Sequence, residues 1–329
     1  MTGIGLLTFV TFFTNVIGVL ARGVASRLPL LLLAGLLACF GLSGCVVLRV
    51  APFPVLPVDA SAEDGNSARM IFERCLAAHG GDLRRHPGDL NLATDGHWFA
   101  LIQRIQPLVT DSAFRIRSEE RYRPAEGLYV VRHTGPSGVK QVVRRAGRIE
   151  AVRYNGELEQ DPAKLSATAM TNDAFRMFHF GLTFFLERVN AWRPLPEAAE
   201  GGRRYHRIIG ALTPGFGDAA EDRVVLWIDF ETFRLFRVHM TLNGFETTKG
   251  AHVDTTFLDY REVAGFLLPT RFHERVLGPL HLDAHTWWTT GLDHDRGWEA
   301  AQVTGDAFTG VAAPPARPLV PAKAPAGTP

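Results

Sequence analysis

Residues 224–276 read VVLWIDFETFRLFRVHMTLNGFETTKGAHVDTTFLDYREVAGFLLPTRFHERV, and this stretch decides the fold. Apolar and polar residues alternate in it over short runs that Gly-containing turns separate. Such period-two alternation between turns is typical of an antiparallel meander. The predicted strands are Val224–Asp229, Leu235–Leu242, Val253–Arg261 and Leu267–Val276.

Short runs of alternating apolar and polar residues, separated by turns, continue on both sides of this stretch. The further predicted strands are Trp98–Ile105, Phe114–Ser118, Leu128–His133, Val139–Arg144, Ile149–Tyr154, Tyr205–Leu212 and Leu280–Thr289. One antiparallel sheet of roughly ten or eleven strands must curl or split. The sequence therefore predicts an α+β domain built on a strongly curved sheet or an incomplete barrel.

Two helices are predicted beside the strands. The first opens the domain, because Ser67 can cap it, Ile71 and Cys75 recur at helical spacing, and Gly80-Gly81 can end it. The second is predicted at Asp173–Ala191, where bulky apolar residues fall on two opposite faces and polar residues on one side. A helix that is apolar on two sides must lie between two apolar surfaces.

One of these surfaces is expected to be the concave sheet. The other is a second helix, a bound acyl chain or a membrane, and the sequence leaves these alternatives open. The candidate ligand-lining residues of this helix are Phe175, Met177, Phe178, Phe180, Phe184 and Phe185.

The N-terminal region has the anatomy of a secretory signal. Arg22 and Arg27 precede the apolar run Leu28–Phe40, which leads to Leu42-Ser43-Gly44-Cys45. This motif resembles the lipobox of bacterial lipoproteins, which implies cleavage before Cys45 and attachment of diacylglycerol to its thiol. The chain is then held to a membrane by lipid.

Three alternatives remain open for this region. Cleavage could instead occur before Cys39, at Leu36-Leu37-Ala38-Cys39, which ranks second to the site before Cys45. The segment could also remain uncleaved and anchor the chain in the membrane. The apolar block Ile4–Leu20 is either an extra helix of roughly 17 residues, barely a bilayer span, or a sign that the true start lies near Val24. We favour the later start.

Cysteine usage separates the two cleavage sites. Cleavage before Cys45 removes Cys39 and uses Cys45 for lipid, so that Cys75 remains alone and no intrachain disulfide can form. Cleavage before Cys39 would leave Cys45 and Cys75 free to pair.

The chain divides into four parts on composition. Residues 1–44 form the signal or membrane segment, and residues 45–64 form a lipidated cysteine with a Pro-rich spacer. Residues 65–305 form one domain. Residues 306–329 are rich in Pro and Ala and are expected to be disordered, because they cannot bury a core.

Charge and motifs exclude several functional classes. The formal net charge is +1, with Lys and Arg scattered among Asp and Glu, so nucleic-acid binding is not expected. The sequence has no Gly-x-Ser-x-Gly elbow, Cys-x-x-Cys pair, Walker loop, dinucleotide fingerprint or His-Glu-x-x-His helix. We therefore expect neither an enzyme nor a cofactor.

His281 and Asp283 are weak candidates for a metal site, together with His285. On one strand, His281 and His285 would stand roughly 13 Å apart at about 3.3 Å per residue, too far for one zinc ion with ligands at about 2 Å. Of Trp287 and Trp288, only one can face the interior.

Several motifs resemble the LolA/LolB-like superfamily of lipoprotein-sorting proteins. The residues that carry the resemblance are Val225-Leu-Trp-Ile-Asp229, the turn from Thr232 to Leu235, Phe257-Leu-Asp-Tyr-Arg261, Gly265-Phe-Leu-Leu-Pro269-Thr270 and Ala78-His79-Gly80-Gly81. The resemblance implies an unclosed antiparallel barrel of about eleven strands, with helices over its concave face and an apolar cavity. By resemblance to sorted lipoproteins, Val46 in place of an aspartate implies the outer membrane.

The leading hypothesis is a non-catalytic lipoprotein, facing the periplasm, that shelters lipid or another apolar ligand beneath the second helix. In this hypothesis the protein takes part in lipid or lipoprotein trafficking in the cell envelope. The alternative is a structural lipoprotein that docks an envelope protein and contains no cavity.

Overall fold

The computed structural model describes residues 52–57 and 61–305. The predicted signal segment, Cys39, Cys45 and the Pro/Ala-rich tail lie outside the described residues. Cys75 is a free, fully buried thiol in the first helix, and burial raises the pKa of this thiol.

In the described part of the chain, thirteen antiparallel strands form one sheet that does not close on itself. Along the sheet the order is β6-β5-β4-β3-β2-β1-β13-β12-β11-β10-β9-β8-β7, so β6 and β7 are its edges. The strands are β1 (Leu90–Trp98), β2 (Arg117–Arg123), β3 (Leu128–Gly135), β4 (Gly138–Arg145), β5 (Arg148–Tyr154), β6 (Glu157–Leu158), β7 (Val189–Glu200), β8 (Arg203–Leu212), β9 (Asp222–Asp229), β10 (Leu235–Thr241), β11 (His252–Val263), β12 (Phe266–Gly278) and β13 (Leu282–His294). The predicted unclosed α+β barrel is confirmed, with two more strands than the eleven expected.

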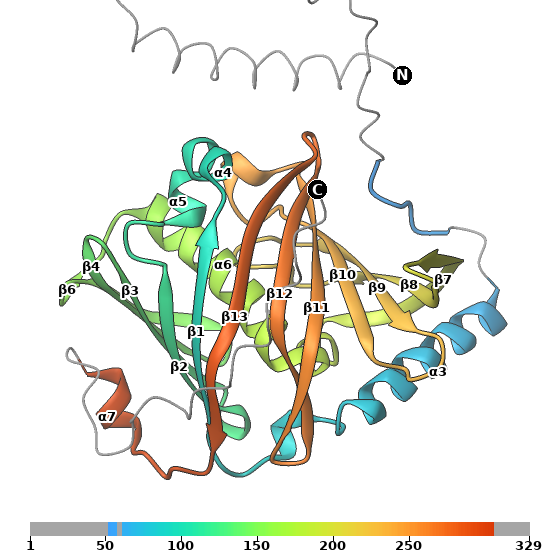
Figure 1. Cartoon of the computed structure of the whole chain (residues 1–329), viewed down its shortest axis with the longest axis horizontal. Helices are drawn as coiled ribbons and strands as arrows, with labels where there is room; N and C mark the ends of the chain where they lie inside the picture. The colour runs from blue at the N-terminus through green and yellow to red at the C-terminus, as the bar shows by residue number, and fades with distance from the viewer. Residues whose placement is uncertain (1–51, 58–60, 306–329) are drawn as a thin grey trace, which may run out of the picture. The chain divides into compact units, whose positions relative to one another are not determined.

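The helices are short except for two. They are α3 (Ala62–Ala78), α4 (Ala100–Ile105), α5 (Pro107–Thr110), α6 (Pro162–Phe180) and α7 (Ala300–Thr304), with the 3-10 turns η1 (Leu83–Arg85), η2 (Pro124–Glu126), η3 (Gly181–Phe185) and η4 (Glu246–Thr248). Helix α6 runs across one face of the curved sheet, behind β1 and β13 in Figure 1, and α3 lies along the β7 end.

The strand predictions need correction at three places, the first of which is Phe114–Ser118, because β2 starts only at Arg117 and continues to Arg123. The expected strand Trp98–Ile105 is the end of β1 followed by α4, because Trp98, Ile102 and Ile105 have helical rather than alternating spacing. Strand β7 was not expected, since Pro194 and Pro196 argue against a central strand. It lies at the sheet edge, where proline is tolerated.

The first helix begins earlier than predicted. Ser61, rather than Ser67, is its N-cap and forms a capping box with Asp64, which satisfies backbone N–H groups of the first turn. The helix ends at Ala78, and Gly80 and Gly81 follow with positive φ as expected.

His79 ties the end of α3 to the sheet. Its Nδ1 donates to the Leu267 carbonyl (2.9 Å), and its Nε2 accepts from the Leu235 N–H (3.0 Å). A Cβ at Gly80 would overlap the Gly265 carbonyl oxygen. The motifs that carry the family resemblance therefore meet at this one junction, and burial lowers the pKa of His79 to about 4.

The second predicted helix has different bounds. Helix α6 starts eleven residues before Asp173, where Asp161 accepts from the Ala163 N–H and Pro162 occupies the first turn. It ends at Phe180 because Gly181 has φ 77°, and residues 181–185 continue as the 3-10 turn η3. The chain from Val189 onward is strand β7, so Asp173–Ala191 is not one helix.

Candidate functional site

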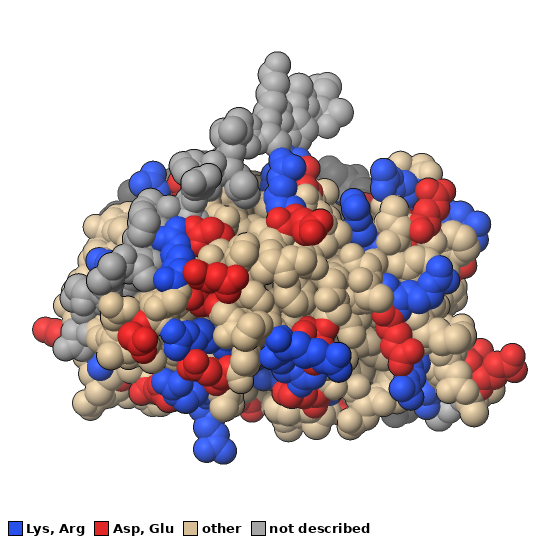
Figure 2. All heavy atoms as spheres, turned by 90° about the horizontal axis from the view of Figure 1, so that it is seen from below, with Lys and Arg blue, Asp and Glu red and all other residues tan. Residues whose placement is uncertain are grey.

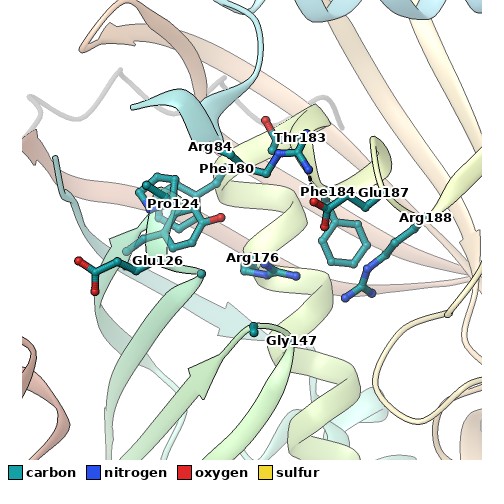
Figure 3. Close-up of a pocket in the computed structure, with 15 residues that line it drawn as sticks. Arg84, Pro124, Glu126, Gly147, Arg176, Phe180, Thr183, Phe184, Glu187 and Arg188 are labelled. Atoms are coloured by element: carbon teal, nitrogen blue, oxygen red, sulfur yellow. Dashed lines mark hydrogen bonds and ion pairs between the residues drawn. The ribbon is translucent and has the colours of Figure 1, made fainter. Parts of the chain in front are cut away.

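A cavity of about 360 Å³ opens at the C-terminal end of α6 (Figure 3). Its walls come from η1, β2, η2, the turn between β4 and β5, α6, η3 and the segment before β7. The lining residues are Arg84, Tyr122, Pro124, Ala125, Glu126, Gly127, Ala146, Gly147, Arg176, Phe180, Gly181, Thr183, Phe184, Glu187 and Arg188. This volume lies at the lower end of the range for small-molecule sites, about 300–1,000 Å³.

One side of the cavity is aromatic. The rings of Tyr122 and Phe180 lie 4.7 Å apart, and Phe184 stacks on Phe216 behind it at 5.5 Å with 11° between the planes. These rings are largely buried, so each presents only an edge or part of a face to the cavity. Such a surface can hold an alkyl or aromatic group.

The other side carries arginines that share one buried carboxylate. Asp173 of α6 is 1% exposed, and its oxygens lie 3.2 Å from Arg144, 3.4 Å from Arg176 and 3.6 Å from Arg188. Arg176 and Arg188 also flank the Phe184 ring, with their guanidinium carbons 5.1 and 4.2 Å from its centre. Figure 3 shows both side chains beside this ring.

Arg84 differs from these two because its charge is already compensated. It forms ion pairs with Asp82 (2.7 Å) and with Glu187, and Glu126 of the cavity wall pairs with Arg123 (3.1 Å). The acidic groups of the wall are thus engaged with other arginines.

The six candidate lining residues separate into three groups. Phe180 and Phe184 line the cavity. Met177, Phe178 and Phe185 have 0% exposure and pack in the main apolar cluster with residues of the sheet and α3. At these three residues, side chains fill the space between the sheet and the segment formed by α6 and η3. The sequence predicts an apolar cavity beneath the helix, whereas the observed cavity lies at the C-terminal end of α6.

The sixth candidate, Phe175, lines a second space of only about 10 Å³, which suits a single water molecule. Its other walls include Arg115, His133, Lys140 and Asn172. All four are buried, and the Asn172 Oδ1 atom has no hydrogen-bond partner in the described structure.

The sheet face beneath α6 is polar where it meets β2, β3 and β4. His179 Nδ1 donates to Glu120 (2.9 Å), Tyr129 donates to the same carboxylate (2.6 Å), and Trp287 donates to His179 Nε2 (2.9 Å). Trp287 is 1% exposed whereas Trp288 is half-buried, so one tryptophan of the pair faces inward, as predicted. The network holds α6 on the sheet.

The metal candidates are not brought together. Asp283 contacts His273 (3.0 Å), and a bulge between Asp283 and His285 turns the first outward and the second into the interior. His281 lies before the strand begins. Among residues 52–57 and 61–305, no group of three or more His, Cys, Asp or Glu side chains is placed to hold a metal ion.

Sequence reasoning missed the arginines of the cavity. Arg176 belongs to the polar side of the predicted helix, and Arg188 falls outside any regular periodicity. The one local signal is the spacing of Asp173 and Arg176, which are three residues apart and can pair on a helix. Their meeting with Arg144 and Arg188 depends on the tertiary fold.

Elsewhere the surface carries charges of both signs. On the face drawn in Figure 2, Lys and Arg alternate with Asp and Glu, separated by uncharged areas. In the described part of the chain no helix is both long and apolar enough to cross a bilayer.

No protein-family model and no curated protein matches the sequence. Among solved structures, a LolA superfamily protein from Nitrosomonas europaea matches with 12% identity and a TM-score of 0.42, over 68% of this chain and 92% of that chain. An outer membrane lipoprotein-sorting protein domain from Vibrio parahaemolyticus matches with 11% identity and a TM-score of 0.39, over 72% and 96%.

The lipoprotein LppX from Mycobacterium tuberculosis is a further structural match, with 10% identity and a TM-score of 0.26, over 54% of this chain and 90% of that chain. At these identities the matched structures concern the fold alone.

Proposed function

We propose that this chain is a non-catalytic lipoprotein that binds the apolar part of an amphiphilic ligand in the cavity at the end of α6. The observation that supports the proposal is the cavity itself, about 360 Å³ with an aromatic side formed by Tyr122, Phe180 and Phe184. Burying alkyl groups there would contribute about 0.8 kcal/mol per methylene. A role in lipid or lipoprotein trafficking of the envelope is part of the same proposal.

The membrane anchor is proposed on the sequence alone. Lipid on Cys45 would hold the domain at the outer membrane, facing the periplasm. Mass spectrometry of the mature N-terminus tests this, because a diacylglycerol-modified Cys45 is the expected terminus and an unmodified or uncleaved chain would contradict it.

The cavity is tested by filling it. Ala125 is exposed at the cavity wall, so Ala125→Trp should occupy the cavity without disturbing the packed interior. The full-length chain, held in amphipol, is irradiated with hexadecanol that carries a diazirine, and the labelled peptides are mapped. We expect labelling at peptides that contain Phe180 and Phe184 and at least a fivefold loss of it in Ala125→Trp, since displacing about one to two methylenes' worth of burial already has this effect.

Ala301→Trp is the matched control, because Ala301 is an exposed alanine on α7 and lies outside the cavity. It should label like the unchanged chain. Uniform labelling over the surface, or equal labelling of the two tryptophan variants, would contradict the proposed function.

The packed interior favours a second candidate function. Met177, Phe178 and Phe185 leave no room for an acyl chain between α6 and the sheet, as expected of a lipoprotein whose outer surface docks an envelope protein. Chemical cross-linking in intact cells tests it. A discrete cross-linked partner together with unlabelled Phe180 and Phe184 would favour docking over ligand binding.

A further inference from the structure

Arg176 and Arg188 carry charge that the surrounding protein does not neutralise. From their placement we propose that they form an anion site, which binds the phosphate or carboxylate head of the ligand while its apolar part lies against Phe180 and Phe184. This rests on the proposed function and specifies the class of ligand.

The charge balance around Asp173 supports the site. Three guanidinium groups share this one carboxylate, which also accepts from the Gly217 N–H at 3.0 Å. One negative charge against three positive charges leaves an excess of two, and the surplus negative charge of the neighbouring Asp82–Arg84–Glu187 group reduces it to one over the whole wall. Burial and the neighbouring arginines lower the pKa of Arg188, so its charged form is the one that a bound anion would stabilise.

The position of the two arginines supports access to a ligand. Arg144 is enclosed, with 4% of its side chain exposed, whereas Arg176 and Arg188 retain 17% and 13% and line the cavity. Arg188 also donates to the Gly215 carbonyl (3.1 Å), and Arg176 interacts with the neutral Tyr122 hydroxyl. None of these partners removes the excess charge.

The remaining charged groups of the wall do not compete for these arginines. Glu187 pairs with Arg84 and Glu126 with Arg123. In a site that is partly withdrawn from water, guanidinium–phosphate and guanidinium–carboxylate hydrogen bonds are stronger than neutral ones and can be bidentate. The aromatic rings adjoin the arginines directly, so one molecule with an anionic head and an apolar tail fits both sides.

The test compares ligands that share a tail and differ in the head. Labelling by the neutral diazirine hexadecanol is competed with dodecyl phosphate, dodecylphosphocholine, dodecanol and inorganic phosphate on the full-length chain in amphipol. We expect dodecyl phosphate to compete about tenfold better than dodecanol, as one charge-assisted hydrogen bond provides, and dodecylphosphocholine, whose phosphodiester anion lies beside a choline cation, to fall between them. Inorganic phosphate alone should compete weakly.

Variants assign the preference to the two arginines. Arg176→Gln and Arg188→Gln should each reduce the preference for dodecyl phosphate over dodecanol about threefold, while competition by dodecanol stays the same. Each leaves Asp173 two guanidinium partners, so folding should be retained. Arg69→Gln on α3 is the control, since Arg69 is exposed and forms a surface ion pair with Glu73, away from the cavity.

A second pair of variants avoids the buried cluster. Ala125→Glu places a negative charge at the cavity wall, and Ala125→Gln has the same size without charge. Only the first should weaken competition by dodecyl phosphate relative to dodecanol, and added salt should reduce the difference.

The outcomes separate the two proposals. Equal competition by all three dodecyl ligands, or a headgroup preference that survives both arginine variants, overturns the anion site and leaves the proposed function standing. Equal competition by inorganic and dodecyl phosphate also overturns it, because the anion would then bind without a tail. Failure of every dodecyl ligand to compete overturns the proposed function.

Discussion

The interior of the sheet has two regions that differ in chemistry. The apolar region lies on β8, β9 and β10 against α3, where Ile208, Leu226, Ile228, Val238 and Met240 are all 0% exposed. The polar region lies beneath α6 on β2, β3 and β4 and at the facing parts of β12 and β13. Its buried residues include Arg115, Glu120, Lys140, Arg144, His179, Glu274 and His285.

The two regions contribute differently to stability. Burying apolar side chains stabilises the fold in proportion to the area removed from water. A buried ion pair such as Lys140–Asp111 (2.7 Å) repays mainly its own desolvation, and the buried His179–Glu120 hydrogen bond (2.9 Å) likewise offsets mainly the removal of both groups from water. The cavity opens at the end of α6 near the polar region, where packing by apolar side chains does not close every space. The apolar region therefore holds the fold together, and the polar region leaves room for a charged site.

The largest effect is expected from Phe185, which belongs to the apolar cluster and lies 5.9 Å from the Trp192 ring. Because Phe185 is fully buried, Phe185→Ala should lower the free energy of unfolding by about 3–5 kcal/mol. Urea unfolding of the full-length chain measures this.

Leu158→Ala is the control for that measurement, since Leu158 is 57% exposed and the change should stay within about 0.5 kcal/mol. A loss below about 1 kcal/mol for Phe185→Ala would mean that the site adapts like a ligand cavity. The packed apolar cluster would then not differ in rigidity from the cavity at the C-terminal end of α6.

The next effect belongs to the polar region and depends on pH. Burial raises the pKa of Glu274 from 4.5 to about 7, although Arg115 opposes the shift. Between these values the folded chain keeps a proton that the unfolded chain has lost, so stability falls as the pH rises. Relative to the unchanged chain, Glu274→Gln should gain about 2–3 kcal/mol on going from pH 5 to pH 8.

His79, at the junction of α3 with the sheet, behaves in the opposite direction. Its pKa falls from 6.5 to about 4 on burial, so the folded chain resists protonation and loses stability as the pH falls through this range. His79→Gln should therefore make the free energy of unfolding less dependent on pH below about pH 6.5. Glu274→Gln should make it less dependent on pH between about pH 5 and pH 8. Urea unfolding from pH 5 to pH 8 distinguishes them, and parallel curves for Glu274→Gln and the unchanged chain would contradict the assignment.

The same contrast explains how much of the fold the sequence predicts. Strands of the apolar region are rich in apolar residues and lie between turns, and the predicted Leu235–Leu242 and Val224–Asp229 differ from β10 and β9 by one or two residues at one end. The first half of α6 was missed because it is rich in small and polar residues such as Thr168, Thr171 and Asn172. These residues are buried only because the sheet opposite them is polar, and apolar periodicity cannot detect this.

The site was predicted in part. Phe180 and Phe184 follow from the apolar pattern, since large aromatic residues beyond the need of one helix face indicate a second contact surface. The arginines could not be predicted, because Asp173, Arg144 and Arg188 lie far apart in the sequence and meet only after the strands and η3 are placed. A single sequence shows the charges but not their shared carboxylate.

The smallest effect is expected outside both regions, where Phe53 of the segment before α3 contacts the sheet. Its ring lies 4.5 Å from His239 and 5.8 Å from His252. His239 follows the inward-facing Val238, so it lies on the side of the sheet opposite α6. Because this contact is peripheral and half-buried, Phe53→Ala should lower the free energy of unfolding by about 0.5–1.5 kcal/mol.

A second measurement separates release of the segment from loss of the fold. Thermolysin should cut near Val55 and Leu56 faster in Phe53→Ala, while the rest of the domain resists cleavage as before. Val55→Ala is the matched control for stability, because Val55 is 73% exposed in the same segment and its truncation should change the free energy of unfolding by no more than about 0.5 kcal/mol. If Phe53→Ala destabilised the domain as much as Phe185→Ala does, the outer contact would be part of the core, and stability would not reside mainly in the apolar region.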